Sequence, residues 1–319
     1  MVVGLFDCDR TGFPNLALMK LSAWHKAQGD TVLPLNSLRP ADRMYASCVF
    51  TWNAPKADLF RRMGAEVGGI GIGKLPKLPP EVHATRPDWS LYGIDYGVGF
   101  LVRGCIRDCG FCSVPENEGL PSLDQPLDDL INPARKRPFV VLMDNEFFWN
   151  VKWAIATMET FTARGIDWCP SQGLDIRCTT PALCAALAAS PFWNLHHTRK
   201  QITFAFDSIR IERRYRQGVE MLLKAGIKAW QLQSFMIVGY DSTIDQDLRR
   251  IEIMQEYGID PFVMVYRDRA TGKASPDRTV RNLARWANRR LHRTIPFTEY
   301  DPSAKVPKRR STFFLQEIA

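Results

Sequence analysis

The chain has 319 residues, of which 45% are hydrophobic and 24% charged, and its net charge is +8. This composition excludes a disordered, collagen-like or coiled-coil protein and leaves room for one large or two modest globular domains. No apolar run reaches the roughly 18 residues of a membrane helix, and the N-terminus lacks the pattern of a signal peptide, so we expect a soluble, cytoplasmic protein without a membrane partner.

Residues 1–75 are predicted to form a small Rossmann-like α/β domain. Short β patterns alternate with a helical pattern, which favours a parallel sheet. The strand patterns are 2–6, 31–35 and 46–50, and the helical pattern is 15–24. A glycine-rich run at 68–73 closes this unit, and the proline-rich segment 76–89 is predicted to be an extended linker.

Residues 90–266 repeat a strand followed by a helix, which predicts an α/β domain built on a partial (βα)6 barrel. The strand patterns are 96–102, 139–143, 167–169, 202–206, 231–238 and 261–265, and the helical patterns include 152–164, 181–189, 211–225 and 244–257. A ligand site in such a fold is expected at the carboxyl ends of the strands. Residues 267–319 are predicted to be a basic extension with a helix at 279–293.

Three cysteines, Cys105, Cys109 and Cys112, lie within eight residues, directly after the first strand of the second domain. Eight cysteines are too few for a disulfide scaffold in a chain of this length, whereas a close group suits metal binding in a reducing compartment. Three thiolates can hold three irons of a [4Fe–4S] cluster and leave the fourth iron open. A structural zinc site is the alternative, although no fourth Cys or His lies nearby.

At these residues the chain resembles the radical S-adenosylmethionine (SAM) superfamily, whose signature C-x3-C-x-aromatic-C is matched by Cys105, Cys109, Phe111 and Cys112. The resemblance extends over most of residues 90–266. It implies a [4Fe–4S] cluster, S-adenosyl-L-methionine as cosubstrate, and an electron donor such as flavodoxin or ferredoxin.

The resemblance also implies roles for polar and aromatic residues that follow the later strands. Asp144, Asn145 and Glu146 stand where relatives bind the SAM amino group, with Asp144 and Glu146 competing for that role. The residues expected at the SAM carboxylate and ribose are Gln172, Asp175, Arg177, Asp207 and Ser208, and those expected at the adenine are Val238, within 237–240, and Tyr266. Without the cysteines, Asp144–Asn145 and Asp207–Ser208 would be interpreted as helix N-caps.

The N-terminal unit loosely resembles the cobalamin-binding domain of one radical SAM subgroup. The cobalt-ligating D-x-H-x-x-G motif is absent, and His25, the only histidine before residue 80, lies inside a helical pattern. We therefore expect a degenerate domain, and cobalamin without a histidine ligand stays open as a less favoured alternative.

Two further features have both a functional and an ordinary interpretation. Cys169 ends a strand and is a candidate hydrogen donor to a product radical, whereas the other scattered cysteines are expected to be core thiols. Thirteen Lys and Arg against four Asp and Glu lie between Arg267 and Arg310. Within that stretch Arg281, Arg285, Arg289 and Arg293 recur at four-residue spacing, which suits either nucleic-acid phosphates or a solvated helix face.

These observations predict a radical SAM enzyme that cleaves SAM to a 5′-deoxyadenosyl radical and abstracts hydrogen from a substrate. The first choice of substrate is a nucleic-acid base or modified nucleotide, in DNA or RNA hypermodification. A peptide or small metabolite is the alternative substrate. A non-catalytic, metal-structured nucleic-acid-binding module is the alternative of another class.

Overall fold

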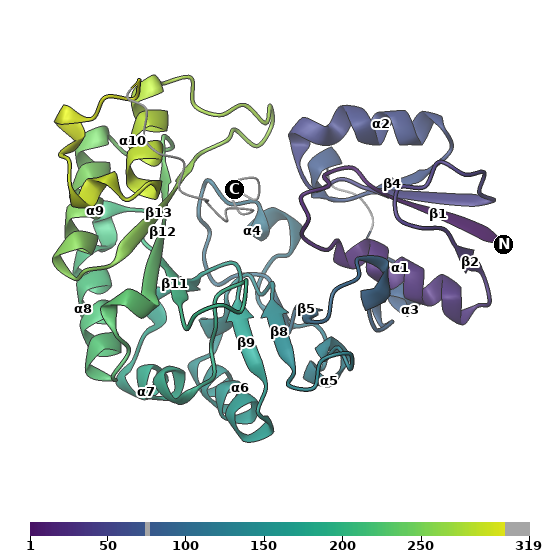
Figure 1. Cartoon of the computed structure of the whole chain (residues 1–319), viewed down its shortest axis with the longest axis horizontal. Coiled ribbons are helices and arrows are strands. Elements are labelled where there is room, and N and C mark those ends of the chain that lie inside the picture. Colours follow the sequence, from purple (N-terminus) through teal and green to yellow (C-terminus); the bar gives the residue numbers. More distant parts are fainter. Residues whose placement is uncertain (74–76, 304–319) are drawn as a thin grey trace.

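The structure, a computed structural model, describes residues 1–73 and 77–303 and has a mixed α/β architecture with parallel sheets. Figure 1 shows a small sheet with its helices at one end of the molecule and strands β11–β13 with helices α8–α10 at the other, while β5, β8 and β9 lie between them. No helix in these two described ranges has both the length and the apolar composition needed to cross a membrane.

The N-terminal sheet has the strand order β2-β1-β3-β4, and every ladder in it is parallel. Its elements are β1 (Val2–Asp7), α1 (Leu16–Ala27), β2 (Thr31–Val32), β3 (Arg43–Ser47), α2 (Ala54–Arg62) and β4 (Glu66–Gly68). Successive side chains of β1 point to opposite faces of the sheet and join different apolar clusters. Leu5 packs in a cluster with Leu18 of α1, and Phe6 packs in a cluster with Ala57 of α2. The sheet is therefore covered on both faces, as parallel sheets require.

The segment after this sheet differs from the extended linker expected for 76–89. It contains a short helix, α3 (Pro80–His83), with proline in its first turn, and a 3-10 turn at Trp89–Leu91. The segment packs on α1, where the Ser22 hydroxyl donates a hydrogen bond to Asp88 (2.6 Å) and the Lys20 ammonium donates one to the His83 carbonyl. Burial lowers the pKa of Lys20 to about 8.

The remaining parallel strands form two sheets. The first has the order β5-β8-β9 and the second β10-β11-β12-β13. Their strands are β5 (Gly97–Gly99), β8 (Phe139–Leu142), β9 (Asp167–Pro170), β10 (Leu174–Asp175), β11 (Ile202–Ala205), β12 (Leu232–Val238) and β13 (Asp260–Val265). Within the described residues no ladder joins β9 to β10, so the six expected strands are not one continuous sheet.

A short antiparallel pair follows β5 and leads into the cysteines. It consists of β6 (Val102–Arg103) and β7 (Ser122–Leu123), and α4 (Val114–Asn117) and α5 (Leu127–Leu130) flank β7. The expected strand at 96–102 thus breaks into two, because Asp144 accepts a hydrogen bond from the Leu101 backbone N–H (2.7 Å) and turns the chain there.

The large helices pack on one face of these sheets. They are α6 (Val151–Arg164), α7 (Pro181–Ala189), α8 (Glu212–Lys224), α9 (Ile244–Glu256) and α10 (Arg278–Asn288). Every second residue of β12, from Leu232 to Val238, is buried, and the residues between them are half-buried. The buried set joins the main apolar cluster with side chains of α8, α9 and α10, so this face of β12 is core.

The basic helix α10 ends at Asn288, five residues earlier than expected, because Arg290 adopts a left-handed conformation (φ 60°). Arg293 therefore lies on the 3-10 turn Leu291–Arg293 rather than on the helix, which corrects the predicted four-residue stripe. Residues 304–319 of the expected basic extension lie outside the described residues.

Arg250 of α9 joins the ends of β11 and β12. Its side chain is fully buried and donates hydrogen bonds to the carbonyls of Phe206 (2.7 Å) and Ile237 (2.9 Å) while pairing with the buried Asp247 (2.5 Å). These two strand ends carry Asp207 and Tyr240, so the buried pair sets their separation.

Replacing Arg250 should destabilise the protein much more than replacing its exposed neighbour. We expect Arg250→Ala to lower the free energy of unfolding by about 3–5 kcal/mol, because it leaves Asp247 buried without its cation. Arg249→Ala, which removes only surface ion pairs, should cost less than about 1 kcal/mol. Urea unfolding followed by circular dichroism measures both, and equal losses would contradict the proposed strand-end connection.

Candidate functional site

The three cysteines lie on the loop between β6 and α4. Cys105, Cys109 and Cys112 are half-buried, and all three thiols are free. The backbone N–H groups of Arg107 and Val114 donate to the sulfurs of Cys105 and Cys112 at 3.4 Å each. Burial raises the pKa of each thiol, that of Cys105 to about 11. Backbone donors aimed at sulfur are what a thiolate ligand uses to stabilise its charge.

The donor set fits an iron–sulfur cluster in number and type, because three free thiols share one short loop and carry backbone donors. Across the described part of the chain, no group of three or more His, Cys, Asp or Glu side chains is arranged to hold a metal ion.

Two side chains after β8 hold the start of the cysteine loop. Asp144 Oδ1 accepts a hydrogen bond from the Leu101 N–H (2.7 Å), and the Asn145 side chain accepts one from the Gly104 N–H (2.8 Å), three residues further along the chain. Gly104 has φ 84°, and a Cβ there would lie 2.4 Å from the Leu120 carbonyl oxygen, so the chain needs glycine at this turn. Asn145 and Asp144 are thus support for the loop rather than groups facing it.

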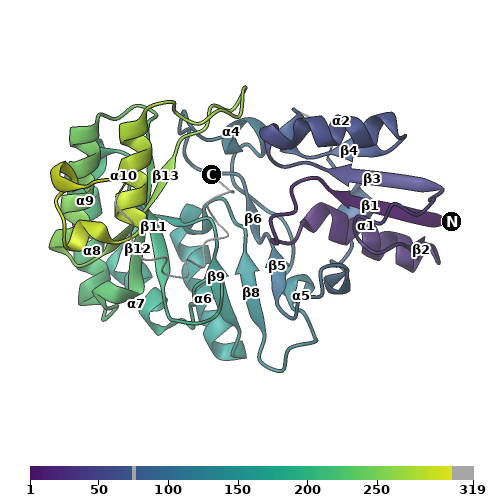
Figure 2. The same cartoon turned by 45° about the horizontal axis from the view of Figure 1, so that its top comes forward.

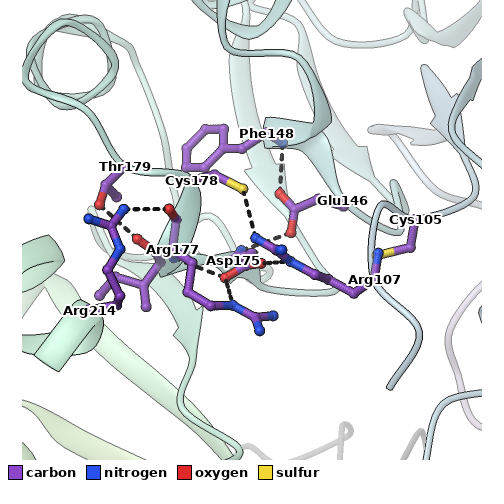
Figure 3. A network of polar contacts seen from close by, with 10 residues as sticks. Cys105, Arg107, Glu146, Phe148, Asp175, Arg177, Cys178, Thr179 and Arg214 are labelled. Carbon is purple, nitrogen blue, oxygen red and sulfur yellow. Dashed lines mark hydrogen bonds and ion pairs between the residues drawn. The ribbon is translucent and has the colours of Figure 1, made fainter. Parts of the chain in front are cut away.

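Asp175 on β10 connects the cysteine loop to the second sheet (Figure 3). Its carboxylate accepts hydrogen bonds from Arg107 Nε (2.6 Å) and Arg177 Nε (2.7 Å). Burial alone would raise the pKa of Asp175, but the hydrogen bonds from Arg177 and Arg107 outweigh it and lower the pKa. Arg107 also places a guanidinium nitrogen 3.9 Å from the Cys178 sulfur. One ionised carboxylate therefore holds two arginines beside the cysteines.

The structure separates the two acids that competed for one role. Glu146 is buried, and its oxygens accept the N–H groups of Phe148 (2.8 Å) and Asp175 (2.9 Å). Burial, followed by the charge of Asp175, raises the pKa of Glu146 to about 8. Its carboxylate points toward Asp175 and lies near Arg107 of the cysteine loop (Figure 3).

Asp144, in contrast, points toward Leu101 and Arg103. Burial raises the pKa of Asp144 to about 7, and its Oδ2 has no hydrogen-bond partner among the described residues. The structure therefore brings Glu146, and not Asp144, to the arginines.

Arg177 carries the cationic part of the site. Its carbonyl accepts a hydrogen bond from Arg214 (2.7 Å), and its Nε is committed to Asp175, whereas none of the described residues takes a hydrogen bond from its two terminal nitrogens. Its charge acts on Cys109 and on Asp207. The two terminal nitrogens of this guanidinium can thus donate hydrogen bonds to a ligand bound between the cysteine loop and β11.

Asp207 and Ser208 follow β11. Asp207 accepts the Ile237 N–H (2.9 Å), and burial raises its pKa to about 6. Of the four residues with an N-cap interpretation, Ser208 caps a 3-10 turn, whereas Asp144, Asn145 and Asp207 accept N–H groups from distant segments. Glu146 and Asp175, for which no cap was predicted, also cap 3-10 turns.

Three aromatic rings lie in contact where β12 and β13 end. The Phe111 ring meets Tyr240 edge-on (5.8 Å between centroids), and Tyr240 meets Tyr266 in the same way (4.8 Å). Tyr240 is 41% exposed, so part of this surface is open. The Val238 side chain, by contrast, is buried in the main core, and the Gln172 side chain is exposed and donates a hydrogen bond to the Ser171 hydroxyl (3.4 Å).

The sequence analysis did not identify Arg269 as a residue that contacts the cysteine loop. Arg269, in the turn after β13, donates a hydrogen bond to the Cys112 carbonyl (2.9 Å) and pairs with Glu116 (3.2 Å). The turn's position after the last strand was the available signal, since such turns reach the same edge of the sheet.

Cys169 and His25 lie away from the cysteine loop. Cys169 is buried in an apolar cluster with Met19 and Val98, and burial raises its pKa to about 12. This placement gives no support to its predicted role as a hydrogen donor. His25 is buried, and its two ring nitrogens bond Asp30 (2.7 Å) and Tyr45 (3.0 Å), so it has no nitrogen free for cobalt.

Three of the four arginines predicted to bind phosphates make contacts within the protein. Arg281 donates a hydrogen bond to the Pro276 carbonyl (3.2 Å), Arg285 donates one to the Pro302 carbonyl (2.8 Å), and Arg293 pairs with Asp260 (2.5 Å). Arg281, Arg289 and Arg293 are exposed. Of these three, only Arg293 pairs with an acidic side chain among the described residues.

No model of a known protein family matches this chain, and no curated protein matches it either.

Removing the Asn145 side chain should loosen the cysteine loop. We expect Asn145→Ala to speed hydrogen exchange of the peptide spanning 101–107 by roughly tenfold, because the Gly104 N–H loses its acceptor. Asn150→Ala, which removes the N-cap of α6 instead, is the matched control. Exchange mass spectrometry compares the two, and an unchanged rate in Asn145→Ala would remove Asn145 as the support of this loop.

Proposed function

We propose that this chain is a radical SAM enzyme. The observation that carries the proposal is the meeting, at the carboxyl ends of parallel strands, of a three-cysteine loop with a buried acid, an arginine with free donors and an open aromatic surface. These are Glu146, Arg177 and the rings of Phe111, Tyr240 and Tyr266. The parallel β5-β8-β9 and β10-β11-β12-β13 sheets support a partial (βα)6 barrel as the arrangement of this domain.

Each residue has a role that follows from its chemistry. Cys105, Cys109 and Cys112 would hold a [4Fe–4S] cluster by three of its irons. Arg177 offers two guanidinium nitrogens to the SAM carboxylate, and Glu146 offers a carboxylate to its ammonium. The rings of Tyr240 and Tyr266 suit the adenine face. When bound, the cluster supplies the electron that cleaves SAM to methionine and a 5′-deoxyadenosyl radical able to abstract hydrogen from a substrate.

A carbon radical also requires a site from which water is excluded and in which the substrate lies at contact distance. The surrounding protein supplies part of this: Phe147 and Phe148, directly after Glu146, are buried in the main core. An electron donor such as flavodoxin or ferredoxin is the partner that this chemistry requires.

For the substrate we keep a nucleic-acid base or modified nucleotide as the first proposal. Arg281 and Arg289 support it, because both are exposed on or next to α10. Trp286, between them, is buried and bonds the Ile295 carbonyl (2.8 Å), so it is not available to stack on a base. A peptide or small metabolite stays the alternative substrate.

Anaerobic reconstitution tests the enzyme class. With iron, sulfide, dithionite and SAM, we expect a cluster and 5′-deoxyadenosine, both lost when Cys105, Cys109 and Cys112 become Ala. Cys184→Ala, which changes a buried thiol of α7, should keep both. Iron content, absorbance and mass spectrometry report the result. Tight zinc without SAM cleavage would instead favour the metal-structured binding module.

SAM affinity should rise with pH. Because the pKa of Glu146 lies near 8, its carboxyl is mostly protonated below that pH and must lose the proton to pair with the SAM ammonium. We expect the dissociation constant to fall by up to tenfold per pH unit between pH 6 and 8 and then to level off. Glu146→Gln should flatten this dependence, and calorimetry at several pH values checks it. A pH-independent wild type would exclude Glu146 as the ammonium partner.

Nucleic-acid binding should depend on the exposed arginines on or next to α10 that have no acidic partner among the described residues. We expect replacement of Arg281 and Arg289 by Gln to weaken binding to DNA or RNA and to lower the slope of log affinity against log salt by about 2. Arg293→Gln, whose side chain already pairs with Asp260, is the matched control and should leave the slope unchanged. Fluorescence anisotropy across a salt series measures this, and identical slopes in all variants would count against a nucleic-acid substrate.

A further inference from the structure

A pocket that is separate from the cysteine loop opens at the opposite edge of the first sheet. Its volume is about 400 Å³, which is within the range of small-molecule sites. Tyr96, directly before β5, and Phe139, the first residue of β8, place it at the amino ends of these strands. Phe13 of the N-terminal unit closes it from the other side.

The walls of this pocket are largely apolar. Phe13, Tyr96 and Leu195 are partly buried and pack on the apolar cluster that fills the junction between the N-terminal unit and the first sheet, and Phe139 belongs to that cluster. The Tyr96 and Phe139 rings lie 6.1 Å apart at 54°. In the described residues, nothing hydrogen-bonds to the Tyr96 hydroxyl. The pocket therefore presents aromatic surface with a polar edge.

Arg135 is held in this pocket by a chain of buried polar groups. Its Nη2 donates to His197 Nδ1 (3.2 Å), and His197 Nε2 meets Asp167 (2.9 Å), whose side chain is 2% exposed and is also held by Arg137. Because a guanidinium only donates, Nδ1 accepts, and the ring proton lies on Nε2. The His197 ring stacks on Phe139 (4.3 Å, 25°). Arg135 is thus oriented before any ligand arrives.

The remaining donors of Arg135 are not satisfied by the protein. Its Nε lies 3.7 Å from Asp95, which is beyond hydrogen-bond distance, and no described residue accepts a hydrogen bond from its Nη1. The Asp95 side chain is 63% exposed, so it stands at the rim. One cation and one anion are therefore held a few ångströms apart beside the aromatic walls, neither fully paired.

We propose that this pocket binds a zwitterionic α-amino acid with an aromatic side chain. The carboxylate would take the free edge of Arg135, with His196 of the lining beside it, and the ammonium would take Asp95. The side chain would lie against Phe13 and Tyr96. A dianionic ligand is disfavoured because Asp95 would repel it. An uncharged aromatic ligand would leave the Arg135 guanidinium and the Asp95 carboxylate without the partners that a zwitterion supplies. The inference does not depend on the function proposed for the cysteine loop.

Calorimetry on the full-length protein, without a cluster, tests this with three probes. L-Phenylalanine carries both charges, 3-phenylpropionate lacks the ammonium, and L-phenylalaninamide lacks the carboxylate. We expect saturable binding of L-phenylalanine and at least roughly tenfold weaker binding of each analogue. Equal binding of all three would show a site for apolar rings only, and no saturable heat at millimolar concentration would overturn the proposal.

Variants assign the two charges. In Arg135→Gln we expect L-phenylalanine and L-phenylalaninamide to bind alike, and in Asp95→Asn we expect L-phenylalanine and 3-phenylpropionate to bind alike. Arg164→Gln, a surface arginine of α6 paired with Asp128, is the matched control and should bind as the unchanged protein does. Circular dichroism checks the fold of each variant, and Arg135→Lys keeps the charge if Arg135→Gln unfolds. Undiminished preference for the zwitterion in folded variants would contradict the assignment.

Discussion

The buried carboxylate of Asp175 is the interaction on which the arrangement of the site depends. It holds Arg107 of the cysteine loop and Arg177 of the 3-10 turn that follows β10, while its backbone N–H donates a hydrogen bond to Glu146 after β8. Within the described residues no ladder joins β9 to β10, so these contacts connect the two parallel sheets, whose strands β8 and β9 lie beside β11 and β12 in Figure 2. Without the Asp175 charge, two guanidinium groups would face each other near the thiols, and the loop would lose its attachment to the second sheet.

The sequence predicted the strands that are long and apolar, and it missed several of the short ones. β8, β11, β12 and β13 carry continuous or alternating apolar residues, and all four were expected. β4 and β10 have three and two residues, and β4 ends in glycine, so neither has a pattern that differs from a loop. The helix α2, which was also missed, buries only Ala57 completely.

The site shows the same division between position and orientation. Strand ends are readable from sequence, so the proximity of the cysteine loop to Glu146, Asp175 and Arg177 was expected. The direction of a side chain is decided by its partners: Asp144 turns to Leu101, and Val238 turns into the core, although both follow or end the expected strands. Contacts such as Arg269 with Cys112 join residues 157 positions apart, and no local pattern records them.

One close approach at the cysteine loop links two distant positions. A Cβ on Gly110 would lie 2.4 Å from the Tyr240 hydroxyl oxygen, so any larger residue at 110 must displace the Tyr240 ring, which contacts Phe111 and Tyr266. The two positions therefore limit each other's choice of amino acid during evolution. Among descendants of this sequence, a residue larger than glycine at 110 should be accompanied by a smaller one at 240, and the pair should change together or not at all.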